Sequence, residues 1–289
     1  MIDAHHHLWD LEAVHYPWLM DKGTSRFFGD PAPIQRDYLI SEFRADAAAM
    51  GFHGSVHIQV GAEDGYAEAC WVQSVADAHP DWPMKQVAFC DLTADSLSDD
   101  LSALQALPCV VGIRQIVGRA PGEDAQSGTN ALLQDPRFDA GLAMLAERGL
   151  SFDLQLIPEL IPAAAAVMAR HPGLKVALCH GGSPYDRSPE GLTRWQAQLA
   201  VMAELDHVHC KLSGLGMFQH DWQTDDFRPI IETCLEIFGA SRCMFGSNFP
   251  VDSLTSDYSR LAQTHLDCVP ESDHAQVFHA TAAAFYRFA

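Results

Sequence analysis

Short apolar runs alternate along this chain with longer amphipathic segments. Eight runs rich in β-branched or other apolar residues predict strands at residues 1–7, 54–60, 84–92, 110–117, 150–157, 174–180, 207–213 and 242–248. The segments 64–79, 138–149, 160–171, 190–205 and 226–239 are rich in Ala, Leu and Glu and predict helices. Strands that alternate with helices favour a parallel sheet, and eight such units predict a single (β/α)8 TIM barrel of the α/β class.

The tail 271–288 predicts an additional C-terminal helix that closes against the barrel. A barrel of this kind commonly uses about 250 residues as one unit, so 289 residues predict one domain over residues 1–289. The chain is 48% hydrophobic and 19% charged, which is typical of a globular protein with a sizeable core.

The formal net charge of -20 argues against nucleic acid and anionic membranes as partners. A small-molecule substrate is therefore expected, and any carboxylate on it would need a local cationic partner. The sequence leaves the oligomeric state open, with a homo-oligomer among the possibilities. The start MIDAHHHLWD lacks a basic and apolar leader, which favours a cytoplasmic protein with reduced cysteines.

Two longer loops follow predicted strands, at residues 8–36 and 118–136. Loops after strands form the active-site face of a barrel, so we expect these two to shape the substrate pocket. The first loop contains five aromatic residues that could line the pocket or pack over the barrel mouth: Trp9, Tyr16, Trp18, Phe27 and Phe28.

Histidines at the ends of two predicted strands indicate a catalytic centre. His5 and His7 share one face of the first strand, while His6 points the other way. The HHH run is too short and too embedded to be an expression tag. His180 ends the sixth predicted strand and precedes Gly181-Gly182, which allow close approach of a ligand. An isolated histidine is often structural, but this placement favours His180 as the third metal ligand beside His5 and His7.

At these residues the sequence resembles a known family. IDAHHHLWD, VALCHGG, MFGSNFPVD and VFHATAAAFYRF are similar to segments of the amidohydrolase superfamily. The resemblance is to its branch of metal-dependent TIM-barrel hydrolases, which contains L-fuconolactonase and 2-pyrone-4,6-dicarboxylate lactonase. It covers essentially the whole chain but does not specify the substrate.

The motif at the end of the eighth predicted strand differs from the sequence that this family usually has there. The family commonly has a metal-binding and catalytic aspartate where this chain has Asn248, and an amide cannot accept a proton. Asp252 supplies the missing carboxylate if Pro250 turns the chain back over the pocket, and our prediction is that it does. The alternative is that Asp252 caps the following helix.

The resemblance implies at most one divalent cation. Strands four and five, VVGIRQIV and LSFDLQLI, lack the bridging residues of binuclear members. One metal, with zinc favoured, or none is therefore expected, because three neutral imidazoles can hold Zn²⁺ with an open position.

Other polar residues within apolar strands fit a substrate pocket. His57, Gln59, Arg114, Gln155 and Lys211 are predicted to bind substrate, together with Trp9 from the first loop. Arg114 suits a carboxylate or a sugar hydroxyl, although a structural pair with an acidic neighbour is an alternative.

The function favoured by these features is hydrolysis of a sugar lactone or carboxylated lactone by an activated water, with His180, Asn248 and Asp252 as catalytic residues. Amide hydrolysis or non-oxidative decarboxylation is an alternative within the superfamily. Because Asn248 replaces the usual aspartate, a catalytically silent ligand-binding barrel also stays open.

Overall fold

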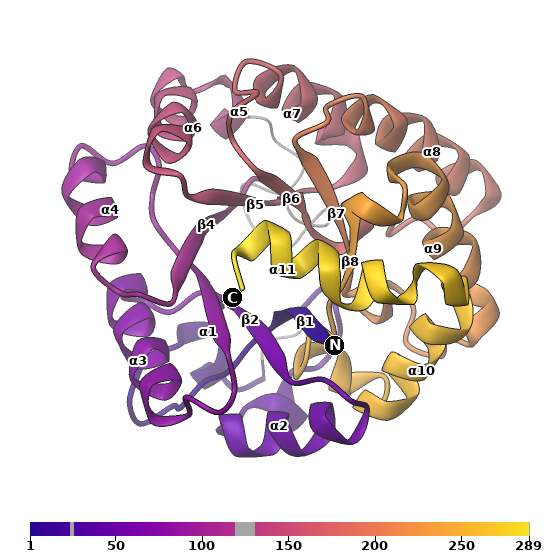
Figure 1. Ribbon diagram of the computed structural model, residues 1–289, viewed down its shortest axis with the longest axis horizontal. Coiled ribbons are helices and arrows are strands. Elements are labelled where there is room, and N and C mark those ends of the chain that lie inside the picture. Colours follow the sequence, from indigo (N-terminus) through magenta and orange to yellow (C-terminus); the bar gives the residue numbers. More distant parts are fainter. Residues whose placement is uncertain (24–25, 119–130, 289) are drawn as a thin grey trace.

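Eight parallel strands form one sheet, in the order β1 to β8, that curves into a nearly closed barrel surrounded by helices (Figure 1). The computed structural model describes residues 1–23, 26–118 and 131–288. The strands are β1 (Ile2–His6), β2 (Gly54–Ile58), β3 (Met84–Ala88), β4 (Val110–Ile116), β5 (Ser151–Gln155), β6 (Val176–Leu178), β7 (Val208–Leu212) and β8 (Cys243–Phe245). The predicted (β/α)8 fold is confirmed.

The helices are α1 (Pro17–Met20), α2 (Ile40–Ala49), α3 (Gly65–Ala78), α4 (Leu97–Gln105), α5 (Ala131–Gln134), α6 (Pro136–Arg148), α7 (Ile161–Met168), α8 (Pro189–Ala203), α9 (Thr224–Phe238), α10 (Tyr258–Cys268) and α11 (Thr281–Tyr286). The five predicted helical segments correspond to α3, α6, α7, α8 and α9. Side-chain caps define several starts: Asp64 accepts hydrogen bonds from the backbone of Tyr66 and Ala67, and Asp257 accepts one from Arg260.

Strands β6 and β8 are shorter than predicted at their carboxyl ends. His180 and Asn248 both have a φ of 57°, a left-handed conformation that ends a regular ladder. Both side chains therefore lie just beyond their strands, on irregular backbone. Strained backbone of this kind is often found at functional sites.

The seam between β8 and β1 closes beyond the end of β8. The backbone NH of Asn248 donates to the carbonyl of His5 at 2.7 Å, and the NH of His7 donates to the carbonyl of Phe249 at 2.7 Å. These bonds hold the segment SNFP directly against the histidines of the first strand.

The C-terminal tail covers the amino-terminal end of the barrel, where α11 crosses the opening in Figure 1. Its residues Ala282, Phe285 and Tyr286 are buried with Ile2, Ala4 and other residues of the strands. The predicted C-terminal helix is confirmed as a continuous helical run over residues 271–286, which begins with a 3-10 turn (Glu271–Asp273), passes through a π-helical turn (Gln276–Ala280) and ends in α11. None of the described helices is both long and apolar enough to span a bilayer.

Candidate active site

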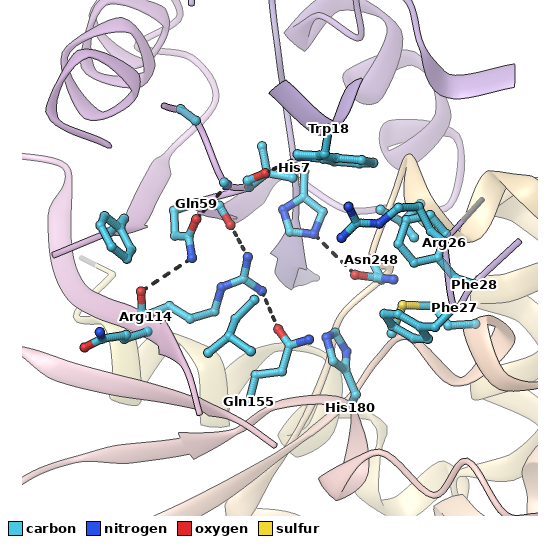
Figure 2. A pocket seen from close by; sticks show the side chains of 18 of the residues that line it. His7, Trp18, Arg26, Phe27, Phe28, Gln59, Arg114, Gln155, His180 and Asn248 are labelled. Atoms are coloured by element: carbon cyan, nitrogen blue, oxygen red, sulfur yellow. Dashed lines mark hydrogen bonds between the residues drawn. The ribbon is translucent and has the colours of Figure 1, made fainter. Parts of the chain in front are cut away.

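A cavity of about 510 Å³ opens at the carboxyl end of the strands. All eight strands contribute to its wall at or just after their ends, as expected for the catalytic face of a barrel. In strand order these residues include His7, Gln59, Phe89, Arg114, Gln155, His180, Met217 and Asn248. Trp18, Arg26, Phe27 and Phe28 from the first long loop complete one side (Figure 2).

Three imidazoles lie together at the base of this cavity. The ring centroid of His5 is 5.2 Å from that of His7 and 4.7 Å from that of His180. His5 is fully buried behind the two lining rings, and neither of its ring nitrogens has a hydrogen-bond partner. His6 points away, and its ring stacks on Phe43 of α2 with centroids 3.9 Å apart. The alternation along the first strand thus separates the cavity-facing histidines from the helix-facing one.

His7 and Asn248 direct two acceptors toward one another. The Nδ1 atom of His7 lies 2.7 Å from the Ile58 carbonyl, which can only accept, so Nδ1 carries the proton. The Nε2 lone pair then faces the Oδ1 atom of Asn248, 3.3 Å away. The Asn248 amide is held in this orientation because its Nδ2 donates to Asp252 at 2.9 Å. A metal ion or a donor hydrogen placed between the two acceptors would satisfy both.

Asp252 reaches the cavity only through Asn248. Its side chain is fully buried and is absent from the cavity wall, and burial raises its pKa to about 7. The alternative of a helix cap is wrong, because Asp257 caps α10 whereas Asp252 lies within a separate 3-10 turn (Val251–Leu254). The predicted direct contact between the Asp252 carboxylate and a catalytic water does not follow from this placement. Asp252 instead lies behind Asn248 and accepts a hydrogen bond from its amide.

His180 is oriented by β7. Its Nδ1 lies 3.0 Å from the Ser213 hydroxyl, just after the end of that strand. The neighbouring Gly214 has a φ of +62°, and a Cβ atom there would lie 2.4 Å from the His180 ring. Sequence reasoning did not identify Ser213, although the alternation that singled out Lys211 places Ser213 on the same face.

Asp3 is a second residue that the sequence did not reveal. Its Oδ1 accepts hydrogen bonds from the backbone NH groups of His5 and Ser247, each at 3.0 Å, and the Tyr258 hydroxyl donates to its Oδ2 at 3.0 Å. Burial raises the Asp3 pKa to about 6. Asp3 thereby ties the strand that bears His5 to the segment that bears Asn248.

Burial makes the three imidazoles weak bases. It lowers the pKa of His5 and His7 well below the usual range, and it lowers that of His180 to about 3. Lys211 adds to the effect at His5, and Arg114 adds to it at His7 and His180. The rings are therefore neutral at pH 7, which is the form that binds metal ions.

Arg114, Gln59 and Gln155 form a polar wall of the cavity (Figure 2). The Arg114 guanidinium donates to the Gln155 side-chain oxygen at 3.0 Å and to the Gln59 backbone carbonyl. The Gln59 amide donates back to the Arg114 carbonyl at 3.4 Å. These hydrogen bonds hold the guanidinium and the two amide side chains at the cavity wall.

Three of the predicted substrate-binding residues lie outside the cavity wall. Lys211 has 0% exposure, and its ammonium binds the Asp153 carboxylate at 2.5 Å and the Ala4 carbonyl at 2.7 Å. The Trp9 indole is buried and donates to the Arg36 carbonyl, and His57 bonds to the Leu8 carbonyl through Nε2. The Lys211 ammonium, the Trp9 indole NH and the His57 Nε2 atom are engaged within the protein, and none of these side chains lines the cavity, so none of the three is retained here as a substrate ligand.

The aromatic residues of the first loop divide in the same way. Trp18, Phe27 and Phe28 face the cavity, whereas Trp9 and Tyr16 are buried below them. Most of the second long loop, residues 119–130, lies outside the described residues.

The donor chemistry of the site fits a divalent cation. In the described parts of the chain, no group of three or more His, Cys, Asp or Glu side chains is already arranged around one metal position. Nevertheless, His5 has two buried ring nitrogens without partners, and His7 and Asn248 direct lone pairs at each other. Neutral imidazoles and one amide oxygen are ligands that Zn²⁺ accepts.

Comparisons with known proteins identify the family. The amidohydrolase family model matches residues 2–288. The chain is 34% identical to an uncharacterized protein of Sinorhizobium fredii, over 99% of this chain and 98% of that one. It is 30% identical to an L-fucono-1,5-lactonase of Burkholderia multivorans, over 90% of this chain and 86% of that one.

A crystal structure of an amidohydrolase from B. multivorans with bound zinc superimposes with a TM-score of 0.84 at 25% identity, covering 100% of this chain and 99% of the other. The sequence match and the shared fold both extend over nearly the whole length of the protein. The chain therefore belongs to the amidohydrolase family.

Proposed function

We propose that this protein hydrolyses lactones, opening a cyclic ester to the corresponding hydroxy acid. The observation that carries the proposal is the group of three neutral, buried imidazoles at the base of a polar cavity, in which both ring nitrogens of His5 lack a partner. Buried polar groups normally have partners, so this group indicates a bound ion or reacting oxygen. The 30% identity to an L-fucono-1,5-lactonase favours a lactone over an amide.

His5, His7 and His180 would hold one divalent cation, with zinc favoured because a related structure was solved with zinc bound. When bound, the cation would polarise the lactone carbonyl and lower the pKa of the attacking water toward neutrality. A separate carboxylate base beside the water is then unnecessary, which accounts for an asparagine at position 248.

The protein's own residues orient the reactants. The Asn248 Oδ1 accepts a hydrogen bond from the attacking water, and Asp252 fixes the amide so that this oxygen faces the site. Arg114 and Gln155 donate to oxygens of the substrate from the opposite wall. The water oxygen bonds to the carbonyl carbon, the ring C–O bond breaks, and the ring oxygen leaves as an alcohol carrying a proton.

Asp252 acts as a positioning residue in this scheme. Its carboxylate contacts the amide of Asn248 and lies outside the cavity wall, so it influences the reaction only through Asn248. This assignment replaces the expectation that Asp252 itself takes the proton from water.

To test the proposal, zinc-loaded protein is incubated with a panel of neutral and carboxylated lactones. Hydrolysis is measured as the release of acid. We expect hydrolysis with kcat/KM of about 10⁴ M⁻¹s⁻¹ or more for the best lactone. His5→Phe should abolish it, while His6→Phe, the same substitution on the helix-facing side of the strand, should retain it.

The other candidate functions predict different results. Opening of cyclic amides to amino acids, or CO₂ release from aromatic acids, without lactone turnover would contradict the proposal. Tight lactone binding without any turnover by the zinc-loaded protein would identify a silent binding barrel.

A further inference from the structure

Two segments from different parts of the sequence meet at one side of the cavity. Trp18 belongs to the first long loop, whereas residues 59–62 follow β2, and all of them line the cavity. The Trp18 indole donates a hydrogen bond to the Val60 carbonyl at 2.7 Å, and the Glu63 NH donates to the His15 carbonyl at 2.9 Å. These two bonds join the loop to the segment after β2. The shape of this side of the cavity therefore depends on how firmly the two segments are held together.

Glu68 lies behind this junction, in the first turn of α3. Its side chain is buried, with 2% exposure, and its Oε1 accepts a hydrogen bond from the Val60 NH at 2.9 Å. Val60 is thus held on both of its backbone groups, by Trp18 at the carbonyl and by Glu68 at the NH. Glu68 itself does not line the cavity, so it acts on a bound substrate only through these neighbours.

The second carboxyl oxygen of Glu68 is linked to the loop through Tyr16. The Glu68 Oε2 atom and the Tyr16 hydroxyl are both buried, and each lacks a hydrogen bond of regular geometry within the described chain, so each is available to the other. Burial raises the pKa of Glu68 to about 7. The Val60 NH, the Arg114 guanidinium and the Tyr16 hydroxyl oppose this rise. The Glu68 carboxyl also raises the pKa of Tyr16, after the larger effect of burial.

We propose that Glu68 is a positioning residue for substrate binding, whose carboxyl group holds Val60 and Tyr16 together and thereby keeps Trp18 at the cavity wall. The inference rests on the proposed lactone hydrolysis and adds to it a residue that controls substrate affinity from outside the cavity. Trp18 and Val60 form part of the wall, whereas the reaction takes place at the histidines. Loss of Glu68 should therefore raise KM and spare kcat.

The test compares three variants on the best lactone of the panel. Glu68→Leu removes both carboxyl oxygens and should raise KM about tenfold or more, with kcat within about threefold of the wild type. Glu68→Gln keeps an oxygen for the Val60 NH and a polar group beside Tyr16, so its KM should stay within about threefold. Tyr16→Phe removes only the hydroxyl and should raise KM about two- to fivefold.

Gln86→Leu is the matched control for a general loss of packing around α3. Gln86 is a buried residue of β3 that does not line the cavity, and its amide donates to the Ala69 carbonyl of α3 at 3.0 Å. Gln86→Leu should lower Tm about as much as Glu68→Leu does, yet leave KM unchanged. An equal rise of KM in both variants, or a lower kcat with unchanged KM in Glu68→Leu, would overturn the assignment. If Glu68→Leu does not fold, Tyr16→Phe decides, and an unchanged KM there refutes the proposal.

Failure of the proposed function has a separate signature, namely that the zinc-loaded wild type hydrolyses no lactone of the panel. Amide hydrogen exchange, measured on peptides by mass spectrometry, then decides the role of Glu68. Faster exchange at residues 13–20 and 59–62 in Glu68→Leu, with unchanged exchange at residues 258–268 of α10, would support the positioning role. Exchange equal to that of the wild type in all three segments, or faster in all three, would refute it.

Discussion

The two ends of this barrel treat buried polar side chains in opposite ways. At the amino-terminal end, Lys211 binds Asp153 and the Ala4 carbonyl, and the Tyr286 hydroxyl lies 2.9 and 3.0 Å from the two Asp153 oxygens. The ammonium, the carboxylate and the hydroxyl of this cluster are matched to one another and fully buried, and α11 crosses this end of the barrel (Figure 1).

At the carboxyl-terminal end several polar groups of the histidine site are unmatched. The two His5 nitrogens have no partner, and the His7 and Asn248 acceptors face each other. His180 and Asn248 also adopt a left-handed backbone that non-glycine residues rarely take.

The difference separates structural from functional polar residues. A buried polar group with all its partners inside the protein stabilises the fold, whereas unpartnered groups that converge beside a cavity indicate a ligand site. Asp153, Lys211 and His5 all face inward from strands of the barrel, so an inward-facing position alone does not distinguish the two sets.

The largest expected effect is on turnover at the carboxyl-terminal end. His180→Asn, which keeps a residue tolerant of the left-handed backbone, should lower kcat about a thousandfold by removing an imidazole from the site. Its free energy of unfolding should stay within about 1 kcal/mol of the wild type, because strained functional sites contribute little stability. Lactone kinetics and urea unfolding measure the two quantities. A loss of more than about 3 kcal/mol in stability would place His180 with the structural set.

The next effect is on stability at the amino-terminal end. Lys211→Met leaves the Asp153 carboxylate buried without its cation and should cost about 3–5 kcal/mol in the free energy of unfolding. The double variant Lys211→Met with Asp153→Leu should recover much of that loss, since no charge is left buried. If Lys211→Met instead has the unfolding free energy of the wild type but fails to bind lactone, Lys211 belongs to the functional residues and not to the structural ones.

A smaller effect separates positioning from proton transfer at Asp252. As a positioning residue, Asp252→Leu should lower kcat about a hundredfold. Asp252→Asn should lower it about tenfold or less, because its amide oxygen still accepts from Asn248. If Asp252 were a general base, kcat would fall about a hundredfold in both variants. Steady-state kinetics on the best lactone distinguish the two outcomes.

The smallest effect is that of Tyr286→Phe. Loss of one hydroxyl that donates to a buried carboxylate should lower the free energy of unfolding by about 1.5–3 kcal/mol and leave kcat unchanged. A lower kcat with an unchanged free energy of unfolding would mean that the amino-terminal cluster influences the active site at the other end of the barrel.

The sequence was sufficient to predict the barrel and the convergence of three histidines, because both follow from local patterns. Alternation along a strand separates His6 from His5 and His7, and a parallel barrel brings all strand ends to one rim. Departures from regular backbone were not predictable in this way. The left-handed turn at Asn248 and the path that leads Asp252 behind it depend on contacts with the first strand.

Lys211 shows the limit of the same reasoning. The alternation indicates which face of the strand it occupies, but not how deep in the barrel its ammonium lies. That depth depends on the stagger between strands and on where Asp153 and α11 lie. Arg26 was missed for a different reason, since the position of a loop residue depends on the tertiary path of its loop.

The most direct test is zinc binding by metal-depleted protein, measured at equilibrium for the wild type, His5→Phe and His6→Phe. The two variants make the same substitution at adjacent positions of one strand, on its opposite faces. We expect one zinc ion per chain in the wild type and in His6→Phe, and an affinity for zinc about a hundredfold or more weaker in His5→Phe. Absence of zinc binding by the wild type, or equal affinity in His5→Phe, would refute a metal site at these histidines.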